Sequence, residues 1–257
     1  MDPSSLMKFP KSYFPYPYMY PPTTSYKKRI KGKDPEYAKR YYSHLGRVNS
    51  PDASIEYKNA KFFVIKSFME EDVHKAMKYQ VWSSTPEGNH RLNDAYMKSK
   101  DEKIPVFLLF SVNGSRQFVG IARMTSEVNF TDKCNHWVQD EKWMGKFKLE
   151  WIFIKDIPNR EFRHIIIPSN ENKPVTNMRD AQEVPYEQGM TVFRVFKNYK
   201  ADTSVLDEFE HYDNDEAKRK KAKVAESFGR ITTDNPRRRG KGRARGRRPQ
   251  ENEHHNA

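Results

Sequence analysis

The sequence predicts an α/β domain from about residue 58 to residue 212, flanked by two arms. Apolar runs of strand length, such as FFVIK (62–66) and IPVFLLFSV (104–112), are intermixed with segments whose apolar residues recur at helical spacing. The first 26 residues hold six prolines and five tyrosines without usable periodicity, and the last part of the chain is rich in arginine and glycine. Both flanks are therefore predicted to be disordered.

The first half of the domain follows from local patterns. FFVIK is a buried strand, and Ser67-x-x-Glu70 has the spacing of a capping box. It predicts a helix from Glu70 to about Tyr79. The stretch VWSSTPEGNHRLNDAY is predicted to be a long loop. IPVFLLFSV and QFVGIARM (117–124) form a hairpin around the turn residues NGS (113–115).

The second half begins with another polar loop, CNHWVQDEKWMG (134–145). WIFIKD (151–156) and RHIII (163–167) are predicted strands. Pro185 fits the first turn of a helix, because its missing N–H is not needed there. The apolar residues of this helix recur at three-residue steps, and they are Met190, Phe193, Phe196 and Tyr199. VLDEF (205–209) adds a short final turn. Upstream, DPEYAKRYYSHL (34–45) is compatible with a short helix inside the N-terminal arm.

The net charge of +13 is concentrated near the C-terminus. Residues 217–250 hold 14 Lys and Arg against two acidic residues, whereas residues 1–216 hold 33 against 30. The run PRRRGKGRARGRRP predicts contact with an RNA backbone. The affinity of such a contact falls as the salt concentration rises. A solubilising tail and a nuclear-import signal are the alternatives. Specific recognition must come from the nearly neutral domain.

Several protein classes are excluded or weakened by missing signals. Cys134 is the one cysteine, so neither an internal disulfide nor a cysteine-rich zinc site is expected. The sequence has no apolar run of membrane-spanning length and no signal peptide. Phosphate-loop, dinucleotide-binding, nucleophile-elbow and zinc-protease motifs are also missing. We therefore expect a binding protein without catalytic residues, cofactor or metal; a nuclease with unrecognised carboxylates is the weak enzymatic alternative.

Three of the four tryptophans stand in unusual places. Trp151 lies within an apolar strand and is expected in the core, whereas Trp82, Trp137 and Trp143 fall at helix ends or in polar loops. If folding brings these three together, they form a cage in which two rings sandwich a flat ligand. Stacking of a nucleobase on an aromatic ring contributes about 1–3 kcal/mol. With the basic tail, this favours a nucleobase as the ligand.

The chain resembles the YTH domain, and within it the YTHDF class. The resemblance runs through four segments between residue 61 and about residue 212: KFFVIKSFMEEDVHKAMKYQVWSSTPEGNHRLNDAY, VFLLFSVNGSRQFVGIARM, WVQDEKWMGKFKLEWIFIKDIPN and NENKPVTNMRDAQEVP. The last is a specific signature. The resemblance implies a curved or barrel-like sheet with helices packed around it. It also implies a non-catalytic RNA-binding module that reads N6-methyladenosine.

The same resemblance implies roles for individual residues. Trp82, Trp137 and Trp143 match the aromatic cage. Four positions match residues that bond or border the base, and they are Asp72, the Ser83 carbonyl, Phe68 and Asn113. Three positions match contacts to the RNA backbone, and they are Lys66, Arg91 and Arg179.

The sequence departs from close relatives at three positions of this site. Phe68 replaces a tyrosine, so a bond from that hydroxyl is lost while a backbone contact survives. Ser83 replaces a cysteine, which matters little if its carbonyl is used. Trp137 and Trp143 are six residues apart instead of five, which makes Trp143 the residue whose position most needs a structure. The N-terminal arm is also shorter than the family's low-complexity region.

These inferences predict three regions: a Pro/Tyr-rich and basic arm (1–57), a YTH domain (58–212) and an Arg/Gly-rich tail (213–257). The expected partner is single-stranded mRNA carrying N6-methyladenosine, with an effect on mRNA stability or translation. Decay or translation machinery would contact the arms. A methyl-lysine peptide reader, whose cage acts through cation–π contacts, and a non-selective RNA-binding protein are the alternatives. The family likeness indicates the cytoplasm, while the basic tail is also compatible with a nuclear fraction.

Overall fold

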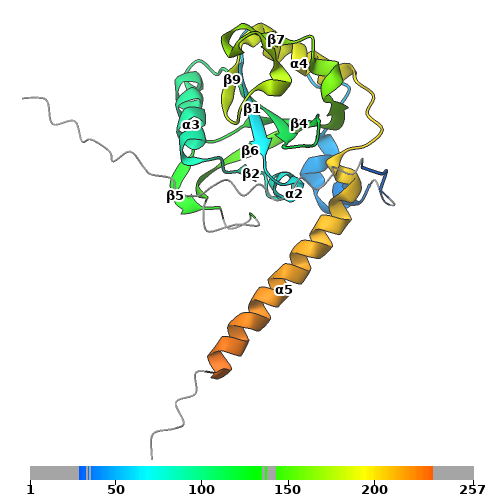
Figure 1. Ribbon diagram of the computed structural model, residues 1–257, viewed down its shortest axis with the longest axis vertical. Coiled ribbons are helices and arrows are strands. Elements are labelled where there is room, and N and C mark those ends of the chain that lie inside the picture. The colour runs from blue at the N-terminus through cyan, green and yellow to red at the C-terminus, as the bar shows by residue number, and fades with distance from the viewer. Residues whose placement is uncertain (1–28, 33, 35, 135–136, 138–142, 234–257) are drawn as a thin grey trace, which may run out of the picture. The chain divides into compact units, whose positions relative to one another are not determined.

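A computed structural model of the 257-residue chain describes residues 29–32, 34, 36–134, 137 and 143–233 (Figure 1). Internal contacts divide the chain into two units, residues 1–212 and 213–257, which are treated separately. The first unit contains the α/β domain.

The domain is built on a sheet with the strand order β2-β6-β4-β3-β1-β9, with β5 paired to β6. The parallel pair is β1 with β3, and the other pairs are antiparallel. The strands are β1 (Lys61–Ser67), β2 (Val81–Trp82), β3 (Val106–Val112), β4 (Gln117–Met124), β5 (Asn129–Lys133), β6 (Met144–Pro158) and β9 (Gln182–Val184). A separate small ladder joins β7 (Ile166–Ile167) and β8 (Lys173–Pro174).

Helices of the first unit pack around this sheet, and the helix that begins at Phe209 runs on into the second unit (Figure 1). The α-helices are α1 (Tyr37–Tyr41), α2 (Glu70–Tyr79), α3 (Pro86–Lys100), α4 (Tyr186–Asn198) and α5 (Phe209–Thr233). Short 3-10 helices connect them: η1 (Ser43–Arg47), η3 (Asn159–Phe162), η4 (Pro168–Asn170), η5 (Val175–Asn177) and η6 (Val205–Glu208).

Alternate residues of the central strands feed two separate hydrophobic cores. In β1, Phe63 and Ile65 face one core while Phe62 and Val64 face the other. This is the two-residue period of a strand buried on both faces. The first core includes residues of α1, α2 and α3, and the second includes residues of α4 and η3. The sheet is thus covered by helices on both faces.

Register irregularities interrupt the β3–β4 and β4–β6 ladders. Extra residues of this kind bend a strand and increase its twist. At Gly120 in β4, a side-chain carbon would lie 2.7 Å from the Trp151 ring of β6. The glycine thus lets that ring cross the sheet closely. The predicted α/β fold with a curved sheet and packed helices is confirmed.

Several predicted elements are confirmed. Helix α2 spans the predicted residues 70–79, and the hairpin of β3 and β4 closes around residues 113–115. The predicted helix α4 forms, although Pro185 is its cap residue and the first turn begins one residue later, at Tyr186. Trp151 is buried, and its indole N–H donates to the carbonyl of Ala76 at 3.2 Å. VLDEF supplies η6.

Other expectations are wrong. The predicted loop after Trp82 contains α3, because the Thr85 hydroxyl caps the helix by accepting from the Gly88 N–H and Pro86 occupies its first turn. The capping box at Ser67 does not form: Met69 is the cap residue, and the Ser67 hydroxyl instead donates to its carbonyl at 2.7 Å. RHIII is a strand only at Ile166–Ile167.

The flanks also differ from the arms expected of them. Residues Ala38, Leu45 and Val48 of the N-terminal region are buried in the first core. At the other end, α5 extends the chain as a helix to Thr233. Most of the Pro/Tyr-rich segment and the run PRRRGKGRARGRRP lie outside the described residues.

Candidate ligand pocket

A pocket forms where the end of β1 and the first turn of α2 meet the β2–α3 connection and the residues before β6. Its cavity volume is about 20 Å³, room for about one water molecule, so the pocket is nearly closed. Its lining residues are Lys66, Ser67, Phe68, Asp72, Trp82, Ser83, Ser84, Thr85, Trp137, Trp143 and Asp180. The three tryptophans that the sequence singled out therefore line one cavity.

Trp82 and Trp137 form the apolar wall of the pocket, and both are buried. Trp82 is held on β2 opposite Phe147 of β6, and its ring stands perpendicular to the Phe110 ring at a centroid distance of 5.0 Å. The Trp82 and Trp137 rings lie 5.0 Å apart with an interplanar angle of 58°. A flat ring sandwiched between two others needs about 7 Å, two van der Waals gaps of about 3.5 Å. The two rings therefore touch each other and leave no such slot.

Trp143 stands at the base of a hairpin. Its carbonyl accepts the Cys134 N–H at 3.1 Å, and β6 begins at the next residue, Met144. The β5–β6 ladder, in which Lys133 pairs with Met144, fixes this base. The half-buried Trp143 ring packs against the first core and lines the pocket. The extra residue of the intervening loop falls at 138–142, outside the described residues.

Polar groups behind the tryptophans are held by an aspartate that the sequence did not single out. Asp180 accepts the Lys66 N–H at 2.8 Å and the Ser84 hydroxyl at 2.8 Å, so it ties β1 to the β2–α3 connection. Burial raises the pKa of Asp180, and its hydrogen bonds and Arg91 oppose that rise. Neighbouring Ser83 is buried, and its hydroxyl donates to the carbonyl of Gly145. The sequence signal for Asp180 was its place in the NENKPVTNMRDAQEVP signature.

The opposite side of the pocket is the turn from β1 into α2. Phe68 is 46% exposed although it is a large apolar residue. Asp72 is half-buried in the first turn of α2, where the partial positive charge of the helix N-terminus stabilises a carboxylate. An apolar ring and a carboxylate thus face the tryptophan wall.

Lys66 lines the pocket with a partly buried ammonium group. Its Nζ donates to the carbonyl of Thr176 at 3.3 Å and lies 5.4 Å from the centroid of the Phe118 ring. Burial lowers the pKa of Lys66 to about 8, although the nearby Asp180 carboxylate works in the other direction. The group therefore keeps most of its charge at neutral pH, at a cost in folding free energy.

We expect Lys66→Met to stabilise the folded protein at pH 7. A lysine whose pKa is lower in the folded state than its ordinary value of about 10.4 destabilises the fold below the folded pKa. This cost disappears as pH rises from about 8 to 10. The gain from the substitution, on the order of 1–3 kcal/mol at pH 7, should therefore shrink at pH 10. Urea unfolding of both proteins at the two pH values measures it; equal gains at both would contradict the burial cost.

Three predicted site residues do not line the pocket. Asn113 is exposed in the β3–β4 turn, where its N–H donates to the carbonyl of Ser67 at 2.9 Å. Arg91 on α3 donates to the carbonyl of Ala181 at 2.9 Å, and Arg179 is exposed one residue before Asp180. The two arginines therefore place positive charge at the Asp180 side of the pocket.

Within the described residues, no group of three or more His, Cys, Asp or Glu is arranged to hold a metal ion. No helix in that part of the chain is long and apolar enough to cross a membrane.

Curated relatives match about two thirds of the chain. The chain is 53% identical over 168 residues to the YTH domain-containing protein ECT3 of Arabidopsis thaliana, covering 65% of this chain and 34% of the relative. It is 47% identical over 169 residues to human YTH domain-containing family protein 2, covering 66% of this chain and 29% of that protein. The chain thus spans about a third of the length of these relatives.

Two solved structures with the same fold are complexes with a methylated nucleoside or RNA. One is the Pho92 YTH domain in complex with m6A, with a TM-score of 0.57 and 39% identity over 61% of this chain and 97% of that one. Another is the YTH domain of the Zygosaccharomyces rouxii MRB1 protein in complex with N6-methyladenosine RNA, with a TM-score of 0.52 and 38% identity over 56% of this chain and 92% of that one. The YT521-B-like domain of the YTH family matches residues 60–197, more than half of the sequence, and these residues contain β1, the tryptophans and Asp180. The chain belongs to the YTH family.

Proposed function

We propose that this protein binds N6-methyladenosine in single-stranded RNA and acts as a reader of that modification, not as an enzyme. The observation that carries the proposal is the convergence of Trp82, Trp137 and Trp143 on one pocket that also contains Asp72 and Ser83. It is supported by membership of the YTH family and by the methyladenosine complexes of two similar YTH domains.

In this proposal the methylated base enters between Trp82 and Trp137, with Trp143 closing the cage. The rings must first separate from 5.0 Å to about 7 Å, so Trp137 or Trp82 moves on binding. The methyl group contributes about 0.8 kcal/mol through burial. Stacking and close packing supply the remaining selectivity. The base must leave its own stack to enter, which favours single-stranded RNA.

Polar groups orient the base in the cage. Asp72 faces the ring edge and the Ser83 carbonyl accepts the remaining hydrogen of the methylamine, while Phe68 contributes through its backbone. Asn113 would reach the base only from outside the lining, because it is exposed in the turn beside Ser67. We therefore expect Asn113 to contribute less than Asp72.

In the proposal, affinity for the RNA backbone comes from basic residues. Lys66 inside the pocket, with Arg91 and Arg179 beside it, would contact phosphates next to the methylated nucleotide. These contacts position the strand but do not distinguish a methylated base from an unmodified one. Selectivity and affinity are thus carried by different residues.

Isothermal titration with one methylated oligonucleotide and its unmodified twin tests the proposal. We expect the methylated strand to bind at least about tenfold more tightly, which corresponds to about 1.4 kcal/mol. A trimethyl-lysine peptide serves as a third ligand, because aromatic cages also bind methylammonium groups. Equal affinity for the two RNAs, or preference for the peptide, would refute the proposal.

Deleting residues 234–257 should lower the affinities for methylated and unmethylated RNA by similar factors. This segment carries eight of the arginines and lysines of the tail. For a single strand, removing one cation–phosphate contact lowers the log–log slope of affinity against salt by about 0.7. Titrations at several salt concentrations measure both the affinities and this slope. Weakening confined to methylated RNA would assign selectivity to the tail.

The biological consequence is also a proposal. Binding would mark mRNAs for altered stability or translation, with decay or translation machinery recruited through the two arms. We propose the cytoplasm as the site of action, with a nuclear fraction directed by RRRGKGRARGRR. Imaging of the full-length protein beside a variant with these arginines replaced by glutamine tests the localisation.

A further inference from the structure

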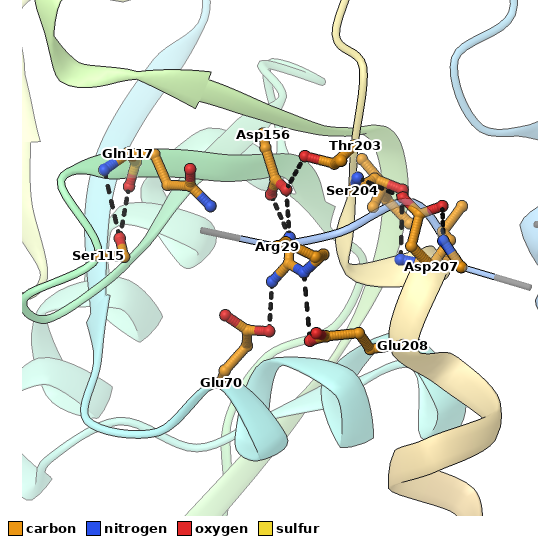
Figure 2. A network of polar contacts seen from close by, with 12 residues as sticks. Arg29, Glu70, Ser115, Gln117, Asp156, Thr203, Ser204, Asp207 and Glu208 are labelled. Carbon is orange, nitrogen blue, oxygen red and sulfur yellow. Dashed lines mark hydrogen bonds and ion pairs between the residues drawn. The ribbon is translucent and has the colours of Figure 1, made fainter. Parts of the chain in front are cut away.

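One arginine from the N-terminal region is almost completely enclosed by acidic side chains. The Arg29 side chain is 2% exposed. Its guanidinium binds Asp156 of β6 through Nη1, Glu70 of α2 through Nη2, and Glu208 of η6 through Nε at 3.4 Å (Figure 2). Three separate elements of the domain are thus joined by a single side chain.

The surroundings are built to hold this guanidinium. The Thr203 hydroxyl donates to Asp156 at 2.8 Å, and the Tyr212 hydroxyl donates to Glu70 at 2.9 Å. Burial raises the pKa of Asp156 and of Glu208, and Arg29 lowers both. Arg29 therefore offsets part of the cost of burying these carboxylates.

A second contact fixes the same segment three residues later. The Gly32 N–H donates to the Asp207 carboxylate at 3.0 Å, and Asp207 also belongs to the capping box of η6. A side-chain carbon at Gly32 would lie 2.2 Å from the carbonyl oxygen of Asp207. The backbone thus approaches η6 as closely as only glycine permits, with Arg29 inserted beside it.

Glu70 connects this cluster to the pocket. It is the first residue of α2 and stands two residues after Phe68 and two before Asp72, both of which line the pocket. Met69, the cap residue of α2, makes no side-chain capping bond. Inside the turn between β1 and α2, the Ser67 hydroxyl bonds the Met69 carbonyl, and the Ser67 carbonyl accepts the Asn113 N–H. The ion pair of Glu70 with Arg29 and the bond from Tyr212 restrain the same turn from behind.

We propose that Arg29 is a positioning residue for ligand binding: by holding Glu70, it fixes the turn that presents Phe68 and Asp72 to the base. Neither Arg29 nor Glu208 lies within residues 60–197, which match the family. Part of the recognition machinery is then supplied from outside the matched domain. This inference rests on the proposed function, because its readout is preference for methylated RNA.

The test compares full-length Arg29→Ala with wild type and with Arg40→Ala. Arg40 is a matched control, because it also forms an ion pair, with Asp34 at 2.9 Å, but its side chain is 59% exposed. Affinities for a methylated oligonucleotide and its unmodified twin are measured at a temperature where circular dichroism shows all proteins folded. Arg29→Lys is a second variant if the alanine variant does not fold, since lysine keeps the charge but not the fork of donors.

We expect Arg29→Ala to weaken binding of the methylated oligonucleotide about tenfold, the size of the effect that loss of an outer-shell partner has at metal sites. Unmodified RNA, bound through backbone contacts, should change less than twofold, and Arg40→Ala should match wild type. Millimolar methylguanidinium should restore part of the affinity by filling the vacated space.

The outcomes separate the two proposals. If wild type prefers methylated RNA and Arg29→Ala keeps that preference at full strength, the positioning role is refuted while the reader function stands. Equal weakening of both oligonucleotides, or no recovery with methylguanidinium, also refutes it. If wild type shows no preference, the reader function itself fails before the variant is considered.

Discussion

Replacing Trp82 by alanine is expected to remove the preference for methylated over unmodified RNA. In the proposed cage this ring is one of the two faces that stack on the base. Stacking on an aromatic ring is worth about 1–3 kcal/mol per base, which corresponds to about 5- to 150-fold in affinity. Without it, the methyl group faces a widened pocket that water can enter. Affinity from the backbone contacts remains, so binding should become weak and unselective.

The control must separate loss of the cage from loss of packing. Trp82 is only 5% exposed and meets Phe110 edge-on, so the alanine variant also leaves a hole in the first core. Trp151→Phe removes part of another ring that meets Phe110, at 4.6 Å, but does not line the pocket. It should lose stability and keep methyl selectivity. A folded Trp82→Ala protein that still prefers methylated RNA would mean that the cage is assigned wrongly.

The elements that the sequence predicted well are those whose own residues determine them. Strand β1 and the hairpin of β3 and β4 are apolar on both faces, a pattern that needs a covered sheet. Helix α3 was missed because PEGNHRLNDAY is polar and buries few apolar residues, chiefly Leu92 and Ala95. Its stability comes from the Thr85 cap and from packing that only the tertiary structure supplies.

The residues of the site also divide into those that the sequence could predict and those that it could not. Three tryptophans in polar segments are conspicuous in the sequence, and they line one pocket. The contact between the Trp82 and Trp137 rings could not be predicted, because the two residues are far apart in the sequence and share no periodic element. Asp180 was missed because its role is to bond a backbone N–H and a hydroxyl from other elements. Such a role leaves no periodic signal.

Arg29 was the least predictable of these residues. It stands in the basic stretch KKRIKGK (27–33), where nothing distinguishes one cation from the next. Such stretches are usually solvated. Its burial follows from Glu70, Asp156 and Glu208, which are far apart in the sequence and meet only when α2, β6 and η6 pack together. Pairwise charge complementarity over these separations cannot be read from one chain.

Arg29→Ala should also cause the largest loss of stability. Removing one partner of a buried ion pair typically costs about 3–5 kcal/mol, because the remaining charge is left without compensation. Here three carboxylates would remain around an empty space, one of them on Asp156, whose side chain is 6% exposed. Chemical unfolding at pH 8, beside wild type and Arg40→Ala, measures the loss; a deficit no larger than that of the control would contradict it.

The pH dependence of this deficit gives a sharper test. Arg29 lowers the pKa of Asp156 and of Glu208, which burial raises, so its removal moves both pKa values further up. A carboxyl whose folded pKa lies above its unfolded value, about 4, binds protons more readily in the folded state. The free energy of unfolding of the variant must then fall as pH rises from the unfolded pKa to the raised pKa of the folded state. The deficit should be smaller at pH 5 than at pH 8.

Adding Asp156→Asn should reproduce the effect of acid at constant pH. In wild type this substitution removes a partner of Arg29 and is expected to destabilise the fold. In the Arg29→Ala background it removes a buried charge that has no remaining partner arginine, so it should stabilise. A change of sign between the two backgrounds is a direct measure of coupling between the two residues. Additive, same-sign effects would show that Asp156 and Arg29 contribute separately, and the acidic cluster would then not be held together by the guanidinium.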